Sequence, residues 1–239
     1  MKTLKTLLFA CLLLALPIEG TQAVELMHSV GGTAVGGGNF SAKPDGLSGP
    51  SDDGIGFRGN AGGWAYGGGL TYELRVGNIG ALEIDFLYET SVLQRYVTVN
   101  GVDFTEKISA GLLRIPILFK LNVPVGVGRF NFGVGPEFTV PMNSEGSVDS
   151  DYPNFTLSNQ IEAEEVNSTL VTIELGLNFD LGSNLELGWK LRGGYNTSQP
   201  SEISERVTYS GSSYSVKTQN TWDFRMLLGV NYLIPQPTE

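Results

Sequence analysis

The residue types with the greatest chemical potential in this chain are carboxylates and basic side chains that recur at every second position. Glu73 and Arg75 are two residues apart, as are Lys190 and Arg192. Groups of this kind can transfer protons in acid–base catalysis, carry ions through a pore, or neutralise one another as ion pairs. A spacing of two places both side chains on the same face of a β-strand, so strands must position them.

The sequence offers no convincing general base for a catalytic role. His28 is the only histidine, and Ser29 follows it directly, so an extended segment places the two side chains on opposite faces where they cannot meet. The chain has no glycine-rich phosphate loop at a strand-to-helix junction and no metal-spaced set of histidines and cysteines. We therefore expect no catalytic residues, no metal and no cofactor, and a protein that is not an enzyme.

The segment that holds Glu73 and Arg75 shows which element positions them. From Trp64 to Val76, apolar or aromatic residues alternate with small and charged ones. This pattern fits a strand whose apolar face meets lipid and whose polar face lines a lumen, which is the reverse of the arrangement in a soluble protein. The sequence therefore predicts a transmembrane β-barrel.

The same alternation recurs in eight segments. They span residues 25–36, 63–76, 81–98, 104–121, 129–140, 168–181, 185–196 and 221–234. Pro116 lies in the fourth segment and indicates a bulge or an unpaired site, because proline has no backbone N–H. We expect an all-β fold, an eight-stranded antiparallel up-and-down transmembrane β-barrel formed by one domain, residues 24–239.

The connections between these segments alternate in length. Residues 37–62, 141–167 and 197–220 are long and polar, whereas 77–80, 122–128 and 182–184 are short. Outer-membrane barrels have short periplasmic turns and long external loops. The connection 100–103 is also short, but its flanking segments exceed the roughly 9 to 11 residues needed to cross a membrane, so we predict a hairpin that projects from the surface.

The inward face of the predicted strands carries charges of both signs. The expected lumen network comprises Glu73, Arg75, Glu83, Asp85, Arg114, Lys120, Glu137, Glu174, Asp180, Glu186, Lys190, Arg192, Asp223 and Arg225. The short turns predict three cross-strand pairs, Arg75 with Glu83, Arg114 with Glu137, and Glu174 with Arg192. Such a network could gate a path for ions or protons, but mutual neutralisation is the favoured interpretation, and a wide permanent channel is not expected.

The outward face is aromatic near the ends of several strands. We expect the residues at the lipid interface to be Trp64, Tyr66, Tyr72, Phe119, Phe130, Trp189, Tyr195, Trp222 and Tyr232. A soluble lipocalin-like barrel would bury this face around an apolar ligand. That alternative requires the inward glycines, such as Gly67 and Gly69, to form a soluble surface, for which they are poorly suited.

The first 23 residues have the pattern of a secretory signal peptide. Lys2 and Lys5 precede an apolar run, and the segment ends in small residues at Ala23, where we expect cleavage. Removal of Lys2, Lys5 and Glu19 changes the formal charge from −10 to −11 and also removes the only cysteine. A charge of this sign disfavours nucleic-acid binding.

The segment Leu113–Leu121, which reads LRIPILFKL, resembles the "L-x-I-P-L-L-x-K" strand of the PorT-like outer-membrane β-barrel family. The resemblance extends over essentially all of residues 24–239. It implies an eight-stranded, OmpA-like barrel in the outer membrane of a Gram-negative bacterium, in a family that offers no catalytic residues to transfer. Near the C-terminus, Gly229, Tyr232 and Ile234 fit the signal for outer-membrane assembly, although residues 235–239 extend beyond it.

These observations favour a structural or surface-interaction role. The alternative is a narrow or gated pore, and less favoured alternatives are a soluble ligand carrier and a lipid-modifying enzyme of the outer membrane. The expected partners are membrane lipid and lipopolysaccharide, the barrel-assembly machinery, and a surface protein that contacts the long loops. We expect a monomer.

Overall fold

The computed structural model describes residues 26–41, 47–48, 55–57, 61–77, 79–99, 102–126, 128–149, 167–198, 204–209, 212–217 and 220–235. The predicted signal peptide, residues 1–23, lies outside the described residues. Every regular element in the described part of the chain is a β-strand. None of these residues belongs to a helix that is long and apolar enough to cross a membrane.

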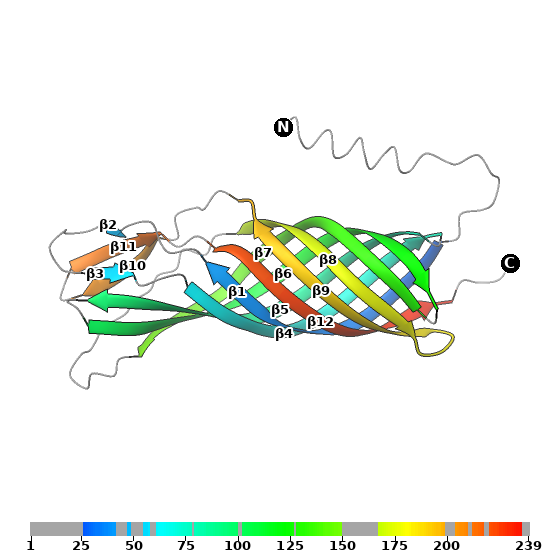
Figure 1. Cartoon of the computed structure of the whole chain (residues 1–239), viewed down its shortest axis with the longest axis horizontal. Helices are drawn as coiled ribbons and strands as arrows, with labels where there is room; N and C mark the ends of the chain where they lie inside the picture. Colours follow the sequence, from blue (N-terminus) through cyan, green and yellow to red (C-terminus); the bar gives the residue numbers. More distant parts are fainter. Residues whose placement is uncertain are drawn as a thin grey trace, which may run out of the picture.

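Eight long strands form a closed barrel (Figure 1). They are β1 (Leu26–Ser41), β4 (Ala61–Val76), β5 (Gly80–Val99), β6 (Val102–Val125), β7 (Gly128–Asp149), β8 (Ser168–Asp180), β9 (Leu185–Asn196) and β12 (Asn220–Ile234). Their order is β5-β4-β1-β12-β9-β8-β7-β6, and the β5–β6 pairing closes the circle. All neighbours are antiparallel, which confirms the predicted eight-stranded barrel.

The two ends of the barrel differ. The end with the short turns near Gly77, Gly126 and Gly182, here the turn end, also holds the start of β1 and the end of β12. Gly77 and Gly126 have φ values of 63° and 56°, a conformation that glycine adopts at little cost. The opposite end, here the loop end, carries the long connections.

Several strands continue past the loop end of the barrel wall. The β4–β5 pairing stops at Gly62 with Gln94, whereas β5 and β6 stay paired up to Val99 with Val102. The predicted β5–β6 hairpin therefore extends beyond the end of β4. A short strand, β3 (Ile55–Phe57), pairs with its β5 side, and β2 (Leu47–Ser48), β10 (Ser204–Tyr209) and β11 (Ser212–Lys217) form a separate sheet.

Three of the strands extend four or more residues beyond their predicted ends. β1 extends to Ser41, β6 to Val125 and β7 to Asp149, beyond the predicted ends at residues 36, 121 and 140. In β6 the apolar alternation simply continues through Val123 and Val125, both half-exposed on the outer face. The predicted turn 122–128 is therefore reduced to the two residues between Val125 and Gly128, which pair.

Two of the three predicted cross-strand registers are wrong. Arg75 lies opposite Ala81 and Glu83 opposite Glu73, whereas Arg114 lies opposite Thr139. Each turn is centred one residue away from the predicted position, which moves every cross-strand partner by two. The third register is confirmed.

In that third register, Glu174 lies directly opposite Arg192.

Hydrogen-bonded pairing is interrupted on both sides of β6. The β5–β6 ladder stops at Ile84 with Ile117 and resumes at Leu87 with Arg114. The β6–β7 ladder has a gap between the pair of Pro116 with Glu137 and the pair of Phe119 with Val134, and Pro136 of β7 lies in this gap. Proline cannot donate a backbone hydrogen bond, so the unpaired site predicted at Pro116 is confirmed.

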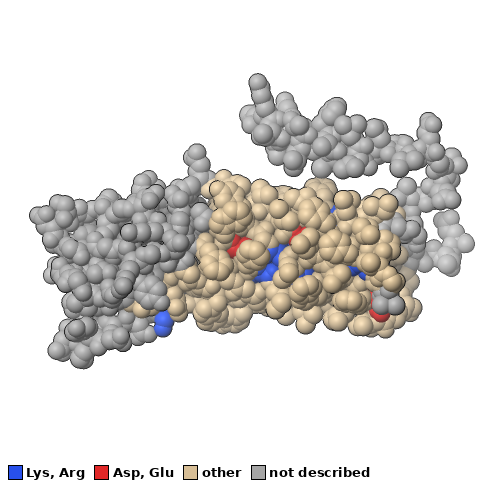
Figure 2. Space-filling model, viewed as in Figure 1, with Lys and Arg blue, Asp and Glu red and all other residues tan. Residues whose placement is uncertain are grey.

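The barrel is apolar outside and polar inside. The outward positions of the eight strands are occupied mainly by exposed large apolar side chains, such as Leu70, Phe86 and Phe224. Among the described residues, most buried side chains are charged or polar, and the fully buried ones include Glu83, Glu174 and Asn131. The visible wall in Figure 2 is mostly uncharged, with a few charged atoms showing through its centre.

Glycines on the inner face allow neighbouring strands to approach closely. A Cβ atom on Gly69 would lie 1.9 Å from the Phe86 carbonyl oxygen, and one on Gly67 would lie 2.0 Å from the Tyr88 oxygen. No side chain fits in that space. The inward glycines therefore permit the tight curvature of the β4–β5 wall.

Candidate functional site

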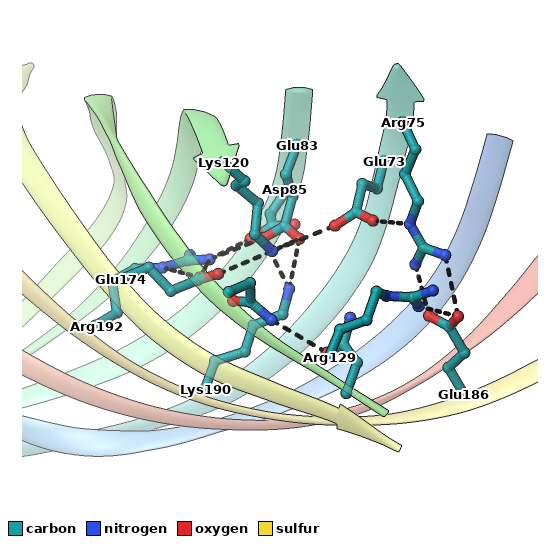
Figure 3. A network of polar contacts seen from close by, with 12 residues as sticks. Glu73, Arg75, Glu83, Asp85, Lys120, Arg129, Glu174, Glu186, Lys190 and Arg192 are labelled. Carbon is teal, nitrogen blue, oxygen red and sulfur yellow. Dashed lines mark hydrogen bonds and ion pairs between the residues drawn. The ribbon is translucent and has the colours of Figure 1, made fainter. Parts of the chain in front are cut away.

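The first candidate site is a network of ten charged residues inside the turn-end part of the barrel, here the balanced cluster (Figure 3). It contains five basic residues, Arg75, Lys120, Arg129, Lys190 and Arg192, and five acidic residues, Glu73, Glu83, Asp85, Glu174 and Glu186. Its formal charge is therefore zero.

Arg75 joins opposite sides of the barrel at the turn end. Its Nη1 and Nη2 atoms donate to the two Glu186 carboxylate oxygens over 3.0 and 2.5 Å, in a bidentate arrangement. Its Nε atom donates to Glu73, and Arg129 also donates to Glu186. These contacts connect β4, β7 and β9 across the lumen.

Lys120 lies at the centre of the balanced cluster. Its Nζ atom is 2.6 Å from Glu83, 3.0 Å from Glu174 and 3.3 Å from Glu73. Lys190 adds a second ammonium group, 2.6 Å from Glu83. An ammonium group surrounded by carboxylates is a structural arrangement, because each charge offsets the desolvation of the other.

Arg192 extends the cluster towards β5. Its Nη2 atom is 2.5 Å from Glu174, its partner in register, and 2.7 Å from Asp85. The same atom is 3.3 Å from Glu83. The three contacts tie β9 to β8 and to the far wall of the barrel.

A second network, here the acidic cluster, lies nearer the loop end. It contains two basic residues, Arg114 and Arg225, and three acidic residues, Glu89, Glu137 and Asp223. Arg114 binds Glu137 and is 2.5 Å from Asp223. Arg225 Nε donates to Glu89 over 2.8 Å. The acidic cluster has a formal charge of −1.

Neutral groups complete the acidic cluster. Arg225 Nη1 donates to the backbone oxygens of Gly38 and Phe224 over 3.1 and 3.0 Å, and Nη2 donates to the Asn39 amide oxygen over 2.8 Å. Thr172 donates its hydroxyl to Glu137 over 3.1 Å. Backbone and amide groups therefore provide contacts that charged partners provide in the balanced cluster.

Three buried apolar side chains, here the septum, lie between the two clusters. Val35, Leu87 and Leu227 contact one another inside the barrel. Leu87 follows Asp85 of the balanced cluster and precedes Glu89 of the acidic cluster on the inner face of β5. On β8, Thr172 is the inward neighbour of Glu174 and donates to Glu137, so the septum separates the two clusters only on the β1, β5 and β12 side of the lumen.

The structure places thirteen of the fourteen predicted lumen residues in the buried interior. The exception is Asp180, which is exposed at the end of β8 because the strand finishes there. Arg114 and Glu137 contact each other diagonally, although they are not opposite in register. Arg75 contacts Glu73 and Glu186 rather than the predicted Glu83.

The predicted network omits Glu89 and Arg129. Glu89 has the inward parity of Glu83 and Asp85, so the alternation alone could have included it. Arg129 follows a turn directly and reaches Glu186, which is 57 residues away in sequence. Arg129 has the inward parity of Asn131 and Glu137, so the alternation could have included it, and only its partner depends on closure of the barrel.

The predicted interface aromatics lie on the outer face in two girdles and between them. At the loop end, Trp64 stacks on Tyr66 with ring centroids 5.2 Å apart, and Tyr195 lies 4.9 Å from Trp222. Tyr72, Tyr232, Phe119 and Phe130 lie in the half nearer the turn end. Trp189 pairs with Leu228 and lies between the two girdles rather than in one.

His28 and Ser29 lie on opposite faces of β1, as the sequence predicts. Ser29 is buried in the interior, whereas His28 lies on the outer face, with its Nδ1 atom 2.8 Å from the Tyr72 hydroxyl. The two residues cannot act together as a nucleophile and a base.

Comparison with known proteins supports the fold. No protein-family model and no curated protein sequence matches the chain. The outer membrane protein OprG from Pseudomonas aeruginosa is similar in structure, with a TM-score of 0.56 and 15% identity over 92% of this chain and 100% of that one. The Neisserial surface protein A aligns with a TM-score of 0.38 and 14% identity, over 86% of this chain and 96% of that chain. The chain therefore shares the fold of a solved outer-membrane β-barrel.

Proposed function

We propose that this protein is a monomeric outer-membrane β-barrel of a Gram-negative bacterium, with a structural and surface-interaction role. One observation carries the proposal: β5, β6 and β7, with 20, 24 and 22 residues, are far longer than the roughly 9 to 11 residues that cross a membrane. The extra length of β5 and β6 stays paired beyond the end of the β4–β5 pairing, and in this proposal it contacts the partner.

The dimensions of the outer belt support residence in a membrane. Trp222 and Tyr232 mark the loop-end and turn-end girdles on β12 and are ten residues apart. At about 3.3 Å per residue and a strand tilt of about 40°, the vertical distance between them is about 25 Å, the typical height of a lipid-facing apolar band.

The short turns support a periplasmic turn end and an external loop end. In this orientation phospholipid and lipopolysaccharide surround the wall, and the barrel-assembly machinery inserts it. The resemblance of residues 113–121 to the PorT-like strand supports membership of that family. The predicted signal peptide supports export of the chain.

The filled interior favours a structural barrel over a pore. The balanced cluster and the acidic cluster follow one another along the lumen, so a permeating ion would have to break ion pairs. A narrow or gated pore is the competing function. Planar-bilayer recordings distinguish them, because the structural role predicts no conductance for the wild-type protein.

Two measurements test the proposal. Heat-modifiable gel migration and circular dichroism should show a β-rich, fast-migrating form in detergent and no folded form in plain buffer. A folded soluble monomer would contradict membrane residence.

Replacing residues 93–106 with a short turn tests the surface role. This variant should keep heat-modifiable migration but lose binding to whole cells or to captured partner proteins. A barrel shortened instead within the 197–220 connection is the matched control. Unchanged adhesion and capture in a folded 93–106 variant would contradict the role of the hairpin.

A further inference from the structure

The inward positions of β5 and β6 change from polar to apolar in the part that extends past β4. Within the barrel, the inward positions of β5 carry buried carboxylates up to Glu89. The pairing then continues without a register shift to Val99 with Val102. Opposite charges occupy one facing pair, Arg95 with Glu106. The other inward positions nearest the tip are apolar, namely Leu93, Val97, Val99, Val102, Phe104 and Ile108.

The outward positions change in the opposite sense. Phe86 and Tyr88 are large and exposed on the lipid-facing wall. The outward positions that follow are mainly polar, with Val92 and Tyr96 as exceptions, and comprise Thr90, Gln94 and Thr98 of β5 and Asp103, Thr105, Lys107 and Ser109 of β6. An antiparallel sheet with one face in water and the other face covered has this pattern.

Strand β3 adds to the same apolar face. Ile55 pairs with Val99 and Phe57 pairs with Val97, so both residues occupy inward positions. Residues 55–57, 93–99 and 102–108 are here called the projecting sheet. Its apolar face continues the inner face of the barrel wall, and an apolar sheet face must be covered for the sheet to be stable.

The separate sheet of β2, β10 and β11, here the loop sheet, is amphipathic as well. Its registers give one face the apolar residues Leu47, Val207, Tyr209, Tyr214 and Val216, together with Glu205. The other face is polar throughout, with Ser48, Ser204, Arg206, Thr208, Ser213, Ser215 and Lys217. A small sheet with one apolar face also needs a second layer.

Short connections hold the loop sheet at the loop end of the barrel. Lys217 ends β11 and Asn220 begins β12, so the two residues are separated by at most about 11 Å. Residues 49–54 join β2 to β3, which belongs to the projecting sheet, over at most about 25 Å. Both sheets lie beyond the loop end of the barrel in Figure 1.

The two sheets start from opposite sides of the barrel. In the circular strand order, β12 is separated from β6 by β1, β4 and β5 in one direction and by β9, β8 and β7 in the other. The loop sheet lies between β9 and β12 in the chain, whereas the projecting sheet continues β5 and β6. The apolar face of the projecting sheet therefore continues the wall that faces the origin of the loop sheet across the lumen.

We propose that the projecting sheet and the loop sheet stack through their apolar faces and form a two-layer β-sandwich at the loop end of the barrel. Stacked sheets lie about 10 Å apart, a spacing that both connections allow. Stacking removes both apolar faces from water and leaves polar faces on the outside. The surface partner then contacts the polar outward face that includes Lys107, a step that rests on the proposed surface role.

Thiol cross-linking of the full-length chain, folded in detergent, tests the stacking. Cys11→Ser removes the only cysteine, so that introduced thiols have no competitor. Val97→Cys or Phe104→Cys is combined with Val207→Cys or Val216→Cys, which places one thiol on the apolar face of each sheet. A bismaleimide with a reach of about 10 Å, the spacing of stacked sheets, should link the two sheets within one chain. Mass spectrometry of the digest identifies the linked peptides.

The control panel moves every thiol by one residue, to the polar face of the same sheet. Thr98→Cys or Asp103→Cys is combined with Thr208→Cys or Ser215→Cys. These pairs should not be linked within one chain, because both layers of the sandwich then lie between the two thiols. Equal cross-linking in the two panels, or none in the apolar panel, would overturn the proposal.

Limited proteolysis is a second measurement, which does not require two chosen positions to align. Val207→Ser combined with Val216→Ser makes the apolar face of the loop sheet polar, so trypsin should cleave at the basic residues of β10 and β11 faster than in the wild type. Thr208→Ser combined with Ser215→Ala also lowers strand propensity, but on the polar face, and should be cleaved at the wild-type rate. Equal cleavage of the two variants would contradict the stacking.

Heat-modifiable migration of each variant reports folding of the barrel separately. A wild-type chain that does not fold in detergent contradicts the proposed function. A folded barrel whose apolar-face thiols are not linked contradicts only the sandwich.

Discussion

The two charged clusters inside the barrel satisfy their charges in different ways. In the balanced cluster, five basic and five acidic residues neutralise one another, and Lys120 alone contacts three carboxylates. In the acidic cluster, Arg225 uses two backbone carbonyl oxygens and the Asn39 amide in addition to Glu89. Removing a charge should therefore be costly in the first cluster and tolerated in the second.

The largest expected effect comes from removing the central charge of the balanced cluster. Lys120→Met leaves Glu73, Glu83 and Glu174 without their shared ammonium group, which should lower the free energy of unfolding by about 3 to 5 kcal/mol. Urea unfolding in detergent, followed by gel migration, measures the loss. Stability within about 1 kcal/mol of the wild type would show that the cluster tolerates an unpaired charge.

The septum is expected to have a smaller effect on stability. Leu87→Ser removes apolar contacts worth about 2 to 4 kcal/mol and leaves both charged clusters intact. Because the ion pairs still fill the lumen, planar-bilayer recordings should show no conductance for this variant. Conductance in Leu87→Ser would assign the seal to the septum instead.

Double-mutant cycles can test the corrected register. Glu174 and Arg192 lie opposite each other and in contact, so truncating both should show a coupling free energy of about 1 to 3 kcal/mol. Arg75 and Glu83 are not in contact and are linked only through Glu73 and Lys120, so they should couple less strongly than Glu174 and Arg192 do. The reverse result would restore the register expected from the sequence.

The smallest expected effect is in the acidic cluster. Glu89→Gln removes one of three carboxylates that share two arginines, so the free energy of unfolding should change by less than about 1 kcal/mol. The same change at Glu83, which binds two lysines, should be clearly destabilising. Equal losses in Glu89→Gln and Glu83→Gln would remove the distinction between the clusters.

The alternation in the sequence predicts nearly all of the strand positions and the two faces of the wall. It fails where an outcome depends on a single residue in a turn, as for Arg75 and Glu83, because a shift of one residue in the turn centre moves each partner by two. It also fails at strand ends, where Asp180 keeps its parity but leaves the buried interior.

The contacts across the lumen have no local signal. Arg225 and Glu89 are 136 residues apart and meet only because the sheet closes on itself. Trp189 has the parity of a lipid-facing residue, but its depth in the membrane follows from its pairing with Leu228. In both cases the stagger between strands decides the position.

The sequence by itself therefore determined which side chains face lipid and which face the lumen, because the two-residue repeat of a β-strand is a property of the local backbone. The tertiary structure decided which charges meet and that Val35, Leu87 and Leu227 come together inside the barrel. These features depend on strand register and barrel closure, which combine residues that are distant in the chain.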